Sequence, residues 1–232
     1  MMNSNFLKVL ENKSASPIYI LDKKYKVSDY IPIDLSVNNT ELEKINVSKS
    51  HEIEDYVFSY INNNHAKVAY GGYFEERGIY NRSSLFSELA VHEHRNMHIG
   101  LDLWAPAHTS VLVPLDGKIH SYAINEGLGN YGPTIILEHI IAGETFYTLY
   151  GHLSFESLKN KEIGMQLKAG EEFAYLGTPE VNGDYAPHLH FQIIKKLDGY
   201  KRDYPGVARK NDLAYYKENC PDPNLLLKIY QE

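Results

Sequence analysis

The densest group of residues suited to metal binding or proton transfer is His188-Leu189-His190. The segment 187–193 around it alternates, with an apolar residue at every second position after His188. In a β-strand, residues two apart point to the same face, so both imidazoles would point one way while the apolar side chains enter the core. On a helix they would lie about 200° apart and could not converge. Without other signals, two half-exposed histidines on a strand remain the alternative reading.

Two further segments carry residues of the same chemical types. His98 and Asp102 are four residues apart, which places them on one face of either a strand or a helix, and Gly100 together with Trp104-Ala105-Pro106 favours the extended form. Imidazole plus carboxylate is a normal ligand combination for zinc. His152 follows a strand-like segment. Alone, a surface pair or a structural histidine would be the commoner reading, but the three signals in one β-rich region support each other.

Short strands separated by turn residues must position these side chains. From about residue 96, turn pairs such as Asp116-Gly117 and Asn182-Gly183 punctuate apolar runs. The candidate strands are Ser110–Pro114, Lys118–Ala123, Pro133–His139, Thr145–Tyr150, Glu172–Leu176 and His188–Ile194. Many short strands with few helical patterns between them predict a mainly β fold, a compact antiparallel β-sandwich or barrel-like core.

The N-terminal part reads differently and is expected to form a small α+β extension. Ile53, Val57 and Ile61 recur at four-residue intervals after Ser50, which could cap a helix. We therefore expect residues 1–90 to form an extension or cap of unknown role, and residues 91–232 to form the main domain with a C-terminal tail, ending in a short helix over 225–230.

Composition restricts the class of protein. Hydrophobic residues make up 43% and charged residues 23% of the 232 residues, a normal globular balance. The formal net charge of -7 argues against binding nucleic acid, which requires a basic face. No apolar run approaches the roughly 18 residues of a membrane span, and no secretory signal is visible. The expected location is therefore the cytoplasm, or the periplasm or exterior if another route exports the chain.

Three motifs, in the same order, give a family resemblance. MHIGLD, LYGHLS and PHLHF resemble the His-x-x-x-Asp, Tyr-x-His-Leu-Ser and His-x-His signature of the lysostaphin/LytM-type zinc peptidases, over roughly residues 95 to 195. The resemblance implies the family's β-fold and one Zn²⁺ per chain, bound by His98, Asp102 and His190. It also implies that His152 and His188 are the catalytic pair that does not bind the metal.

Three protein ligands would leave the fourth zinc position for water, as in catalytic sites. Zinc would lower the pKa of that water and polarise a carbonyl, and His188 or His152 would take the proton. The resemblance therefore predicts a zinc metalloendopeptidase whose substrate is a peptide or a peptidoglycan-derived peptide. The alternatives are a cytoplasmic zinc amidohydrolase acting on a small peptide or amide, and a metal-binding regulatory module without turnover. Protein partners are not predicted.

Other residues have simpler readings. The histidines at 51, 65, 108 and 120 are expected on the surface, and His92 and His94 in an exposed loop. His139 is expected to face out of its strand or to pack beside the groove. Cys220, the one cysteine, is expected to be a buried packing thiol. Tyr131 and the loop Pro179 to Ala186 are expected to edge the groove, the loop as a mobile wall.

Overall fold

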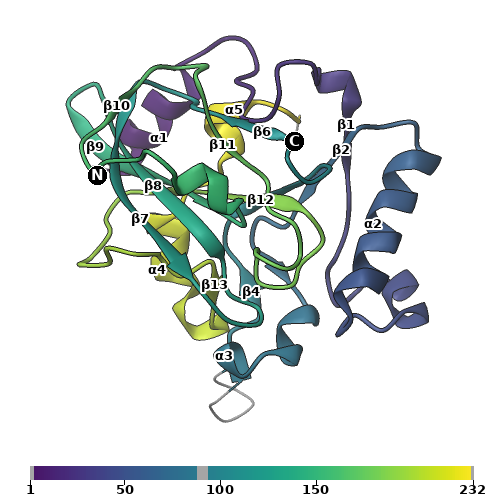
Figure 1. The fold of residues 1–232 in the computed structure, drawn as a ribbon. Coiled ribbons are helices and arrows are strands. Elements are labelled where there is room, and N and C mark those ends of the chain that lie inside the picture. The colour runs from purple at the N-terminus through teal and green to yellow at the C-terminus, as the bar shows by residue number, and fades with distance from the viewer. Residues whose placement is uncertain (1–2, 88–93, 231–232) are drawn as a thin grey trace.

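The computed structural model describes residues 3–87 and 94–230. It is a β-rich fold with few helices (Figure 1). The strands are β1 Tyr30–Pro32, β2 Val68–Gly71, β3 Glu75–Glu76, β4 Met97–His98, β5 Leu101–Trp104, β6 Ser110–Leu112, β7 Gly117–Asn125, β8 Gly132–Ile141, β9 Glu144–Gly151, β10 Gln166–Leu167, β11 Glu172–Tyr175, β12 His188–Ile194 and β13 Val207–Ala208. The α-helices are α1 Asn3–Glu11, α2 Ser50–Asn63, α3 Ser84–Ser87, α4 Leu213–Asn219 and α5 Asn224–Leu227.

Eight strands form the main sheet, in the order β1-β2-β5-β12-β9-β8-β7-β10. All neighbours in it are antiparallel except β1 and β2, which run parallel. A two-stranded sheet of β11 and β6 and a three-stranded sheet of β13, β4 and β3 complete the β-structure. The prediction of a mainly β core is confirmed, and the predicted strand over 188–194 has the observed bounds.

The core follows the alternation in the strands. The largest apolar cluster lies on one face of the main sheet and includes Leu189, Phe191 and Ile193 of β12, beside Leu101 and Leu103 of β5. The other face of β12 therefore carries its polar residues. In β12 even these are buried, because other segments of the chain cover that face.

The first part of the chain joins this sheet. β2 pairs with β5, and the register places Gly71 opposite Asp102 and Ala69 opposite Trp104. Helix α2 lies beside this end of the sheet (Figure 1) and buries Ile53, Val57 and Ile61 in a second apolar cluster. The domain boundary at residue 90 stays a prediction, but residues before it supply strands β1 and β2 to the main sheet.

Two predicted helix details differ from the structure. Ser50 is the first residue of α2, which Lys49 precedes as the capping residue, and the Ser50 hydroxyl instead donates to Asp184 Oδ1. The last helix is α5, shorter than the predicted range and ended by Lys228 in the left-handed conformation. Among the described residues, no helix combines the length and apolar character needed to span a membrane.

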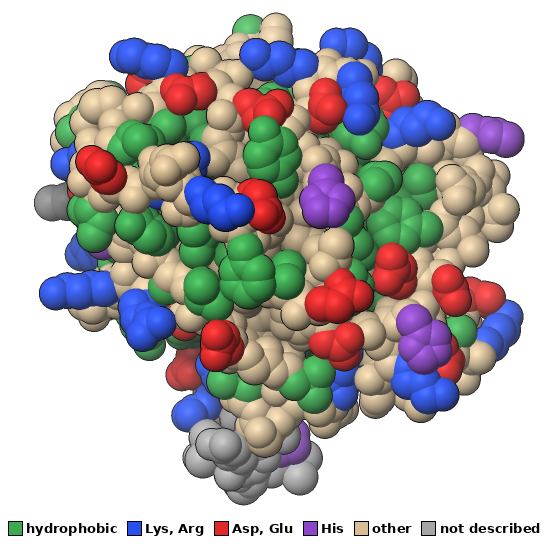
Figure 2. All heavy atoms as spheres, in the orientation of Figure 1, with side chains coloured by type: hydrophobic (Ala, Val, Ile, Leu, Met, Phe, Trp, Pro, Cys, Tyr) green, Lys and Arg blue, Asp and Glu red, His purple; other side chains and the backbone are tan. Residues whose placement is uncertain are grey.

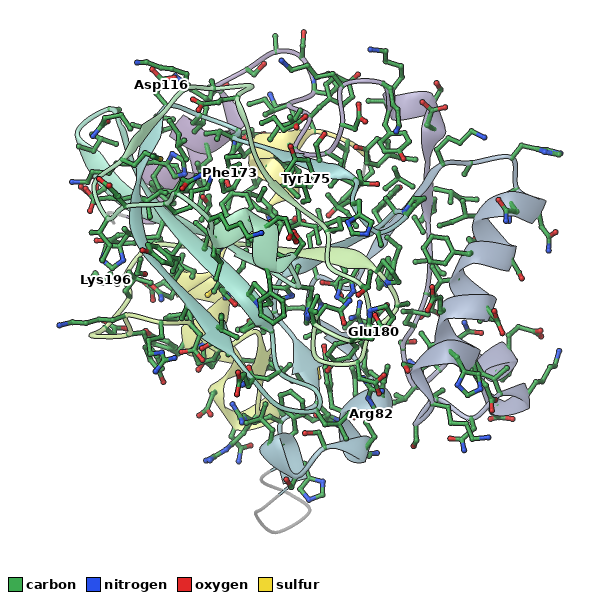
Figure 3. The ribbon with its side chains drawn as sticks, viewed as in Figure 1. Arg82, Asp116, Phe173, Tyr175, Glu180 and Lys196 are labelled. Carbon is green, nitrogen blue, oxygen red and sulfur yellow. The ribbon has the colours of Figure 1, made fainter. Side chains whose placement is uncertain are left out.

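The surface mixes charges of both signs. On the face shown in Figure 2, acidic and basic side chains are interspersed with apolar and neutral ones. Figure 3 places Asp116 and Lys196 on one side of the molecule and Arg82 and Glu180 on the other, next to α2.

Candidate active site

The structure brings together the five side chains that the sequence singled out. Asp102 of β5 lies directly opposite His190 of β12 in the sheet register, and His190 in turn lies opposite Gly151. His98 comes from β4, in the three-stranded sheet, and reaches the same point because the chain bends at Gly100 between β4 and β5. A Cβ atom at Gly100 would lie 2.4 Å from His190 Cε1, so glycine is needed where the ring covers the bend.

Three donor atoms converge at one point. His98 Nε2 lies 2.8 Å from His190 Nδ1, and Asp102 Oδ1 lies 3.1 Å from His190 Nδ1 and 3.3 Å from His98 Nε2. Donor atoms around a tetrahedral zinc, with bonds of about 2.0–2.1 Å, would be about 3.3 Å apart. The observed triangle is slightly tighter than this, and His98, Asp102 and His190 form a group that could hold one metal ion.

The hydrogen-bond partners fix which ring nitrogens carry protons. His98 Nδ1 lies 2.7 Å from the Gly72 carbonyl oxygen, which only accepts, so Nδ1 donates and Nε2 presents its lone pair. Gln192 donates its amide to Pro205 O, so its Oε1, 3.1 Å from His190 Nε2, accepts from that nitrogen. His190 Nδ1 therefore also presents a lone pair.

Two imidazole lone pairs and a carboxylate oxygen thus face each other in a buried site. Burial lowers the pKa of His98 to about 4, so this imidazole is neutral near pH 7. Burial disfavours a charged Asp102, but His98 and Arg77 hold its pKa well below the usual range. Facing lone pairs repel unless a cation lies between them, so the donor set fits a metal ion such as zinc.

The second oxygen of Asp102 is held by a residue that the sequence reading missed. Arg77 Nη1 donates to Asp102 Oδ2 at 2.6 Å, and Arg77 Nε donates to Glu75. The guanidinium is buried and lies over the Trp104 ring, 5.4 Å from its centroid. This contact leaves Asp102 one free oxygen for a metal. No local pattern in the sequence indicates the contact between Arg77 and Asp102, because 25 residues separate the two partners.

His152 and His188 lie beside the three converging atoms of His98, Asp102 and His190. The centroids of the His152 and His188 rings are 4.2 Å apart, and His188 Nε2 is 3.9 Å from Asp102 Oδ1. His152 Nδ1 donates to Asn182 O and His188 Nδ1 donates to Ala186 O, both at 2.7 Å. Each ring therefore keeps a lone pair on Nε2.

Burial lowers the pKa of both imidazoles, that of His152 further because His188 and His190 adjoin it. Both rings are consequently neutral proton acceptors near pH 7. His152 also has a positive φ of 62°, an uncommon conformation for a residue other than glycine, asparagine or aspartate. The Pro179–Ala186 loop fixes both rings through the carbonyls of Asn182 and Ala186.

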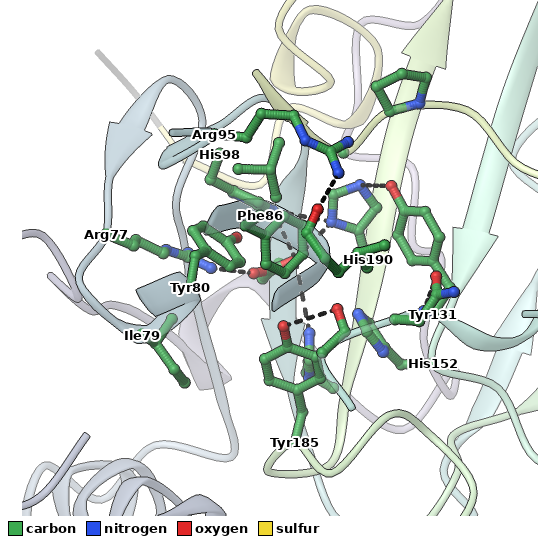
Figure 4. A pocket seen from close by; sticks show the side chains of 18 of the residues that line it. Arg77, Ile79, Tyr80, Phe86, Arg95, His98, Tyr131, His152, Tyr185 and His190 are labelled. Atoms are coloured by element: carbon green, nitrogen blue, oxygen red, sulfur yellow. Dashed lines mark hydrogen bonds and ion pairs between the residues drawn. The ribbon is translucent and has the colours of Figure 1, made fainter. Parts of the chain in front are cut away.

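These side chains line a cavity of about 200 Å³ (Figure 4). Tyr131 and Tyr185 belong to its wall, as the sequence indicated for Tyr131 and the loop. The Tyr131 hydroxyl donates to Tyr204 O at 3.1 Å and lies 3.4 Å from His190 Nε2. Gly151 permits this arrangement, since a Cβ there would lie 2.5 Å from the Tyr131 ring.

The other histidines that the structure describes do not line the cavity. Those at positions 51, 65 and 108 are exposed, while His120 is half-buried. His139 is buried and bonds to Asp116 O and the Thr148 hydroxyl, so, contrary to the expectation, it neither faces out of its strand nor lines the cavity. His94 is half-buried, and His92 lies outside the described residues.

Gln192 is the second functional residue that was missed, although the strand period that aligns His188 with His190 also places Gln192 on that face. Cys220 is buried as predicted, and burial raises the pKa of its thiol to about 12. The folded chain places its sulfur 3.2 Å from Gln192 Nε2, one side chain away from His190.

Comparisons with known proteins place the site in a family. A sequence model of peptidase family M23 matches residues 96–203. Solved structures that resemble the chain include one from Pseudomonas aeruginosa assigned to peptidase M23, at 20% identity over 57% of this chain and 44% of that one, with a TM-score of 0.38. The catalytic domain of the antimicrobial peptidase lysostaphin from Staphylococcus simulans aligns at 28% identity over 53% of this chain and 80% of that domain, with a TM-score of 0.33.

A zinc-containing peptidase from Vibrio cholerae aligns at 27% identity over 47% of this chain, with a TM-score of 0.33. The aligned part spans 32% of that protein, so this chain matches a minor part of its length. No curated protein matches the chain significantly. The family model covers all five converging side chains, from His98 to His190. This part of the chain, residues 96–203, therefore matches the peptidase family M23 in sequence.

Proposed function

We propose that the protein is a zinc-dependent metallopeptidase that hydrolyses a peptide or amide bond, with His98, Asp102 and His190 as the metal ligands. The observation that carries the proposal is the convergence of two imidazole lone pairs and one carboxylate oxygen within 3.3 Å. When bound there, zinc would act as a Lewis acid toward the scissile carbonyl and would lower the pKa of a water molecule.

The two remaining histidines supply proton transfer. His152 and His188 each donate Nδ1–H to a backbone carbonyl and keep an Nε2 lone pair that can accept a proton. A neutral imidazole in this state can take the proton of an attacking water and then return it to the leaving amine. The backbone carbonyls keep the ring orientation fixed during both transfers. His152 and His188 are 5% and 4% exposed, and both line the cavity, through which water can reach them.

Two substrate classes are to be compared. The resemblance of the sequence motifs implies peptidoglycan peptides, whereas the small cavity favours a short soluble peptide or amide. The test incubates the zinc-loaded protein with purified peptidoglycan sacculi and, separately, with a library of short peptides, and identifies new ends by mass spectrometry. His188→Ala and His152→Ala serve as variants that keep all three proposed ligands.

We expect new peptide ends with the wild-type protein, and loss of at least about 100-fold in rate in each variant with zinc content unchanged. Cleavage of sacculi alone would identify a wall peptidase. Zinc binding at one ion per chain with no cleavage of either substrate class would favour the regulatory module. Cleavage that survives both substitutions would refute the assigned roles of the pair.

A further inference from the structure

One part of the cavity wall is apolar and comes largely from outside the family segment. It is formed by Leu35, Ile53, Ile79, Trp104 and Ala186. The first three precede residue 96, where the family match begins. Leu35, Ile53, Trp104 and Ala186 belong to one buried cluster, with Ile79 packed against it. These five residues are called the apolar end of the cavity below.

The apolar end adjoins the site of proton transfer. Trp104 of β5 lies opposite His188 of β12 in the register, and their rings stack with centroids 5.6 Å apart. His188 Nε2 in turn lies 3.9 Å from Asp102 Oδ1, one of the three converging donor atoms. A side chain bound in the apolar end would therefore belong to a residue directly beside the scissile bond.

The other part of the cavity wall carries charged residues and reaches solvent. It carries the charges of Arg95 and Asp203 among apolar side chains such as Phe86, and its Tyr200 and Leu85 are 45% and 41% exposed. In Figure 4, Arg95 and Ile79 lie on opposite sides of the His98–His190 pair. The cavity therefore runs from a charged, partly exposed mouth, past the proposed metal ligands, to the apolar end, where all residues but Ile79 are buried.

From this arrangement, and resting on the proposed function, we infer that the apolar end is a subsite for a compact aliphatic side chain next to the scissile bond of a short peptide or amide. The volume of about 200 Å³ supports the short length, because pockets for drug-sized ligands usually have about 300–1,000 Å³. Polar ends of the substrate would face the mouth, where Arg95 and Asp203 offer one charge of each sign.

The test measures the binding of metal-directed probes, so that it does not depend on the natural substrate. Protein loaded with Co²⁺ in place of zinc is titrated with glycine hydroxamate and leucine hydroxamate, whose side chains lie on the acyl side of the metal-binding group. Mercaptoacetyl-glycine and mercaptoacetyl-leucine place the side chain on the amine side. The visible absorption of cobalt reports binding directly.

In one of the two pairs, the leucine probe should bind about 10- to 100-fold more tightly than the glycine probe, as expected for burying one aliphatic side chain. Extending that leucine probe by four glycine residues should not tighten it. Longer probes that bind more tightly than the short one would show that the site accepts extended peptides and would overturn the inference.

Two isoleucines on one helix provide a matched pair of variants. Ile53 and Ile61 are both buried on the same face of α2, but Ile53 alone lines the cavity. For this comparison the preferred leucine probe is paired with the same compound carrying phenylalanine in place of leucine. Ile53→Ala should shift the ratio of the two affinities toward the phenylalanine compound by about 10-fold, because it enlarges the subsite by the volume of several methylene groups. Ile61→Ala removes the same atoms from the core and should leave the ratio unchanged. A ratio of affinities is independent of how much protein folds, and Leu35→Ala provides a second enlargement if Ile53→Ala is too unstable.

The possible failures are distinguishable. If cobalt binds but none of the four probes alters its spectrum, no open metal position exists, and the proposed function falls together with this inference. If the probes bind but both leucine probes equal their glycine partners, or if Ile61→Ala changes the ratio as much as Ile53→Ala, the subsite is refuted while the metal site stands.

Discussion

Replacing Arg77 with glutamine should destabilise the metal-free protein far more than the zinc-loaded protein. Arg77 is 4% exposed and donates to Asp102 Oδ2 at 2.6 Å, and Asp102 is 1% exposed. Removing one partner of a buried ion pair leaves an uncompensated charge and costs about 3–5 kcal/mol. In the zinc-loaded protein the cation compensates Asp102, so we expect a clearly smaller loss in the free energy of unfolding.

The assay is equilibrium unfolding in urea, with excess zinc or with a chelator, for wild type and Arg77→Gln. Arg82→Gln is the matched control. The Arg82 side chain is also buried, but its partner Asp184 is 45% exposed and stays hydrated when the arginine is removed. Loss of the Arg82–Asp184 ion pair should lower the free energy of unfolding by about 1 kcal/mol or less, equally with and without zinc.

The reasoning about Asp102 would be wrong if Arg77→Gln cost the same in the two metal states, or no more than Arg82→Gln. Equal losses would mean that Arg77 acts mainly through packing against Trp104 or through Glu75. A larger loss with zinc bound than without it would mean that Arg77 holds Asp102 in the only geometry that can bind the metal.

Three other predictions follow from the site. Burial lowers the pKa of His98 to about 4 from an ordinary value of about 6.5, so the unfolded chain takes up this proton at a higher pH than the folded chain does. The metal-free protein should therefore lose stability as the pH falls from about 6.5 toward 4. Thermal melts over this pH range should show a smaller loss in His98→Gln. Gln192→Leu removes the acceptor of His190 Nε2 and should weaken zinc binding about 10- to 100-fold in a chelator competition, whereas Gln192→Glu keeps an acceptor and should retain it. Gly100→Ala would place a Cβ 2.4 Å from His190 Cε1, so the protein should lose zinc without any change of ligand; a variant with full zinc content in elemental analysis would contradict this.

The sequence alone predicted the elements whose signals are local. Alternation within residues 188–194 identified β12 and showed that His188 and His190 share a face, because a strand repeats every two residues. The four-residue spacing of Ile53, Val57 and Ile61 identified the buried face of α2. In both cases the repeat of the backbone determines, from the spacing in the sequence alone, which side chains point to the same face.

The tertiary structure decided what surrounds those residues. Arg77 reaches Asp102, Gln192 links His190 to Cys220, and Ser50 bonds to Asp184 rather than capping its helix. None of these contacts between segments has a sequence period, since each depends on how separate elements pack. The cavity wall depends on packing in the same way, because α2 and the segment before β2 cover the site from outside residues 96–203. Sequence thus predicted which residues bind a metal and move protons, whereas packing between distant segments decided the size and polarity of the space around them.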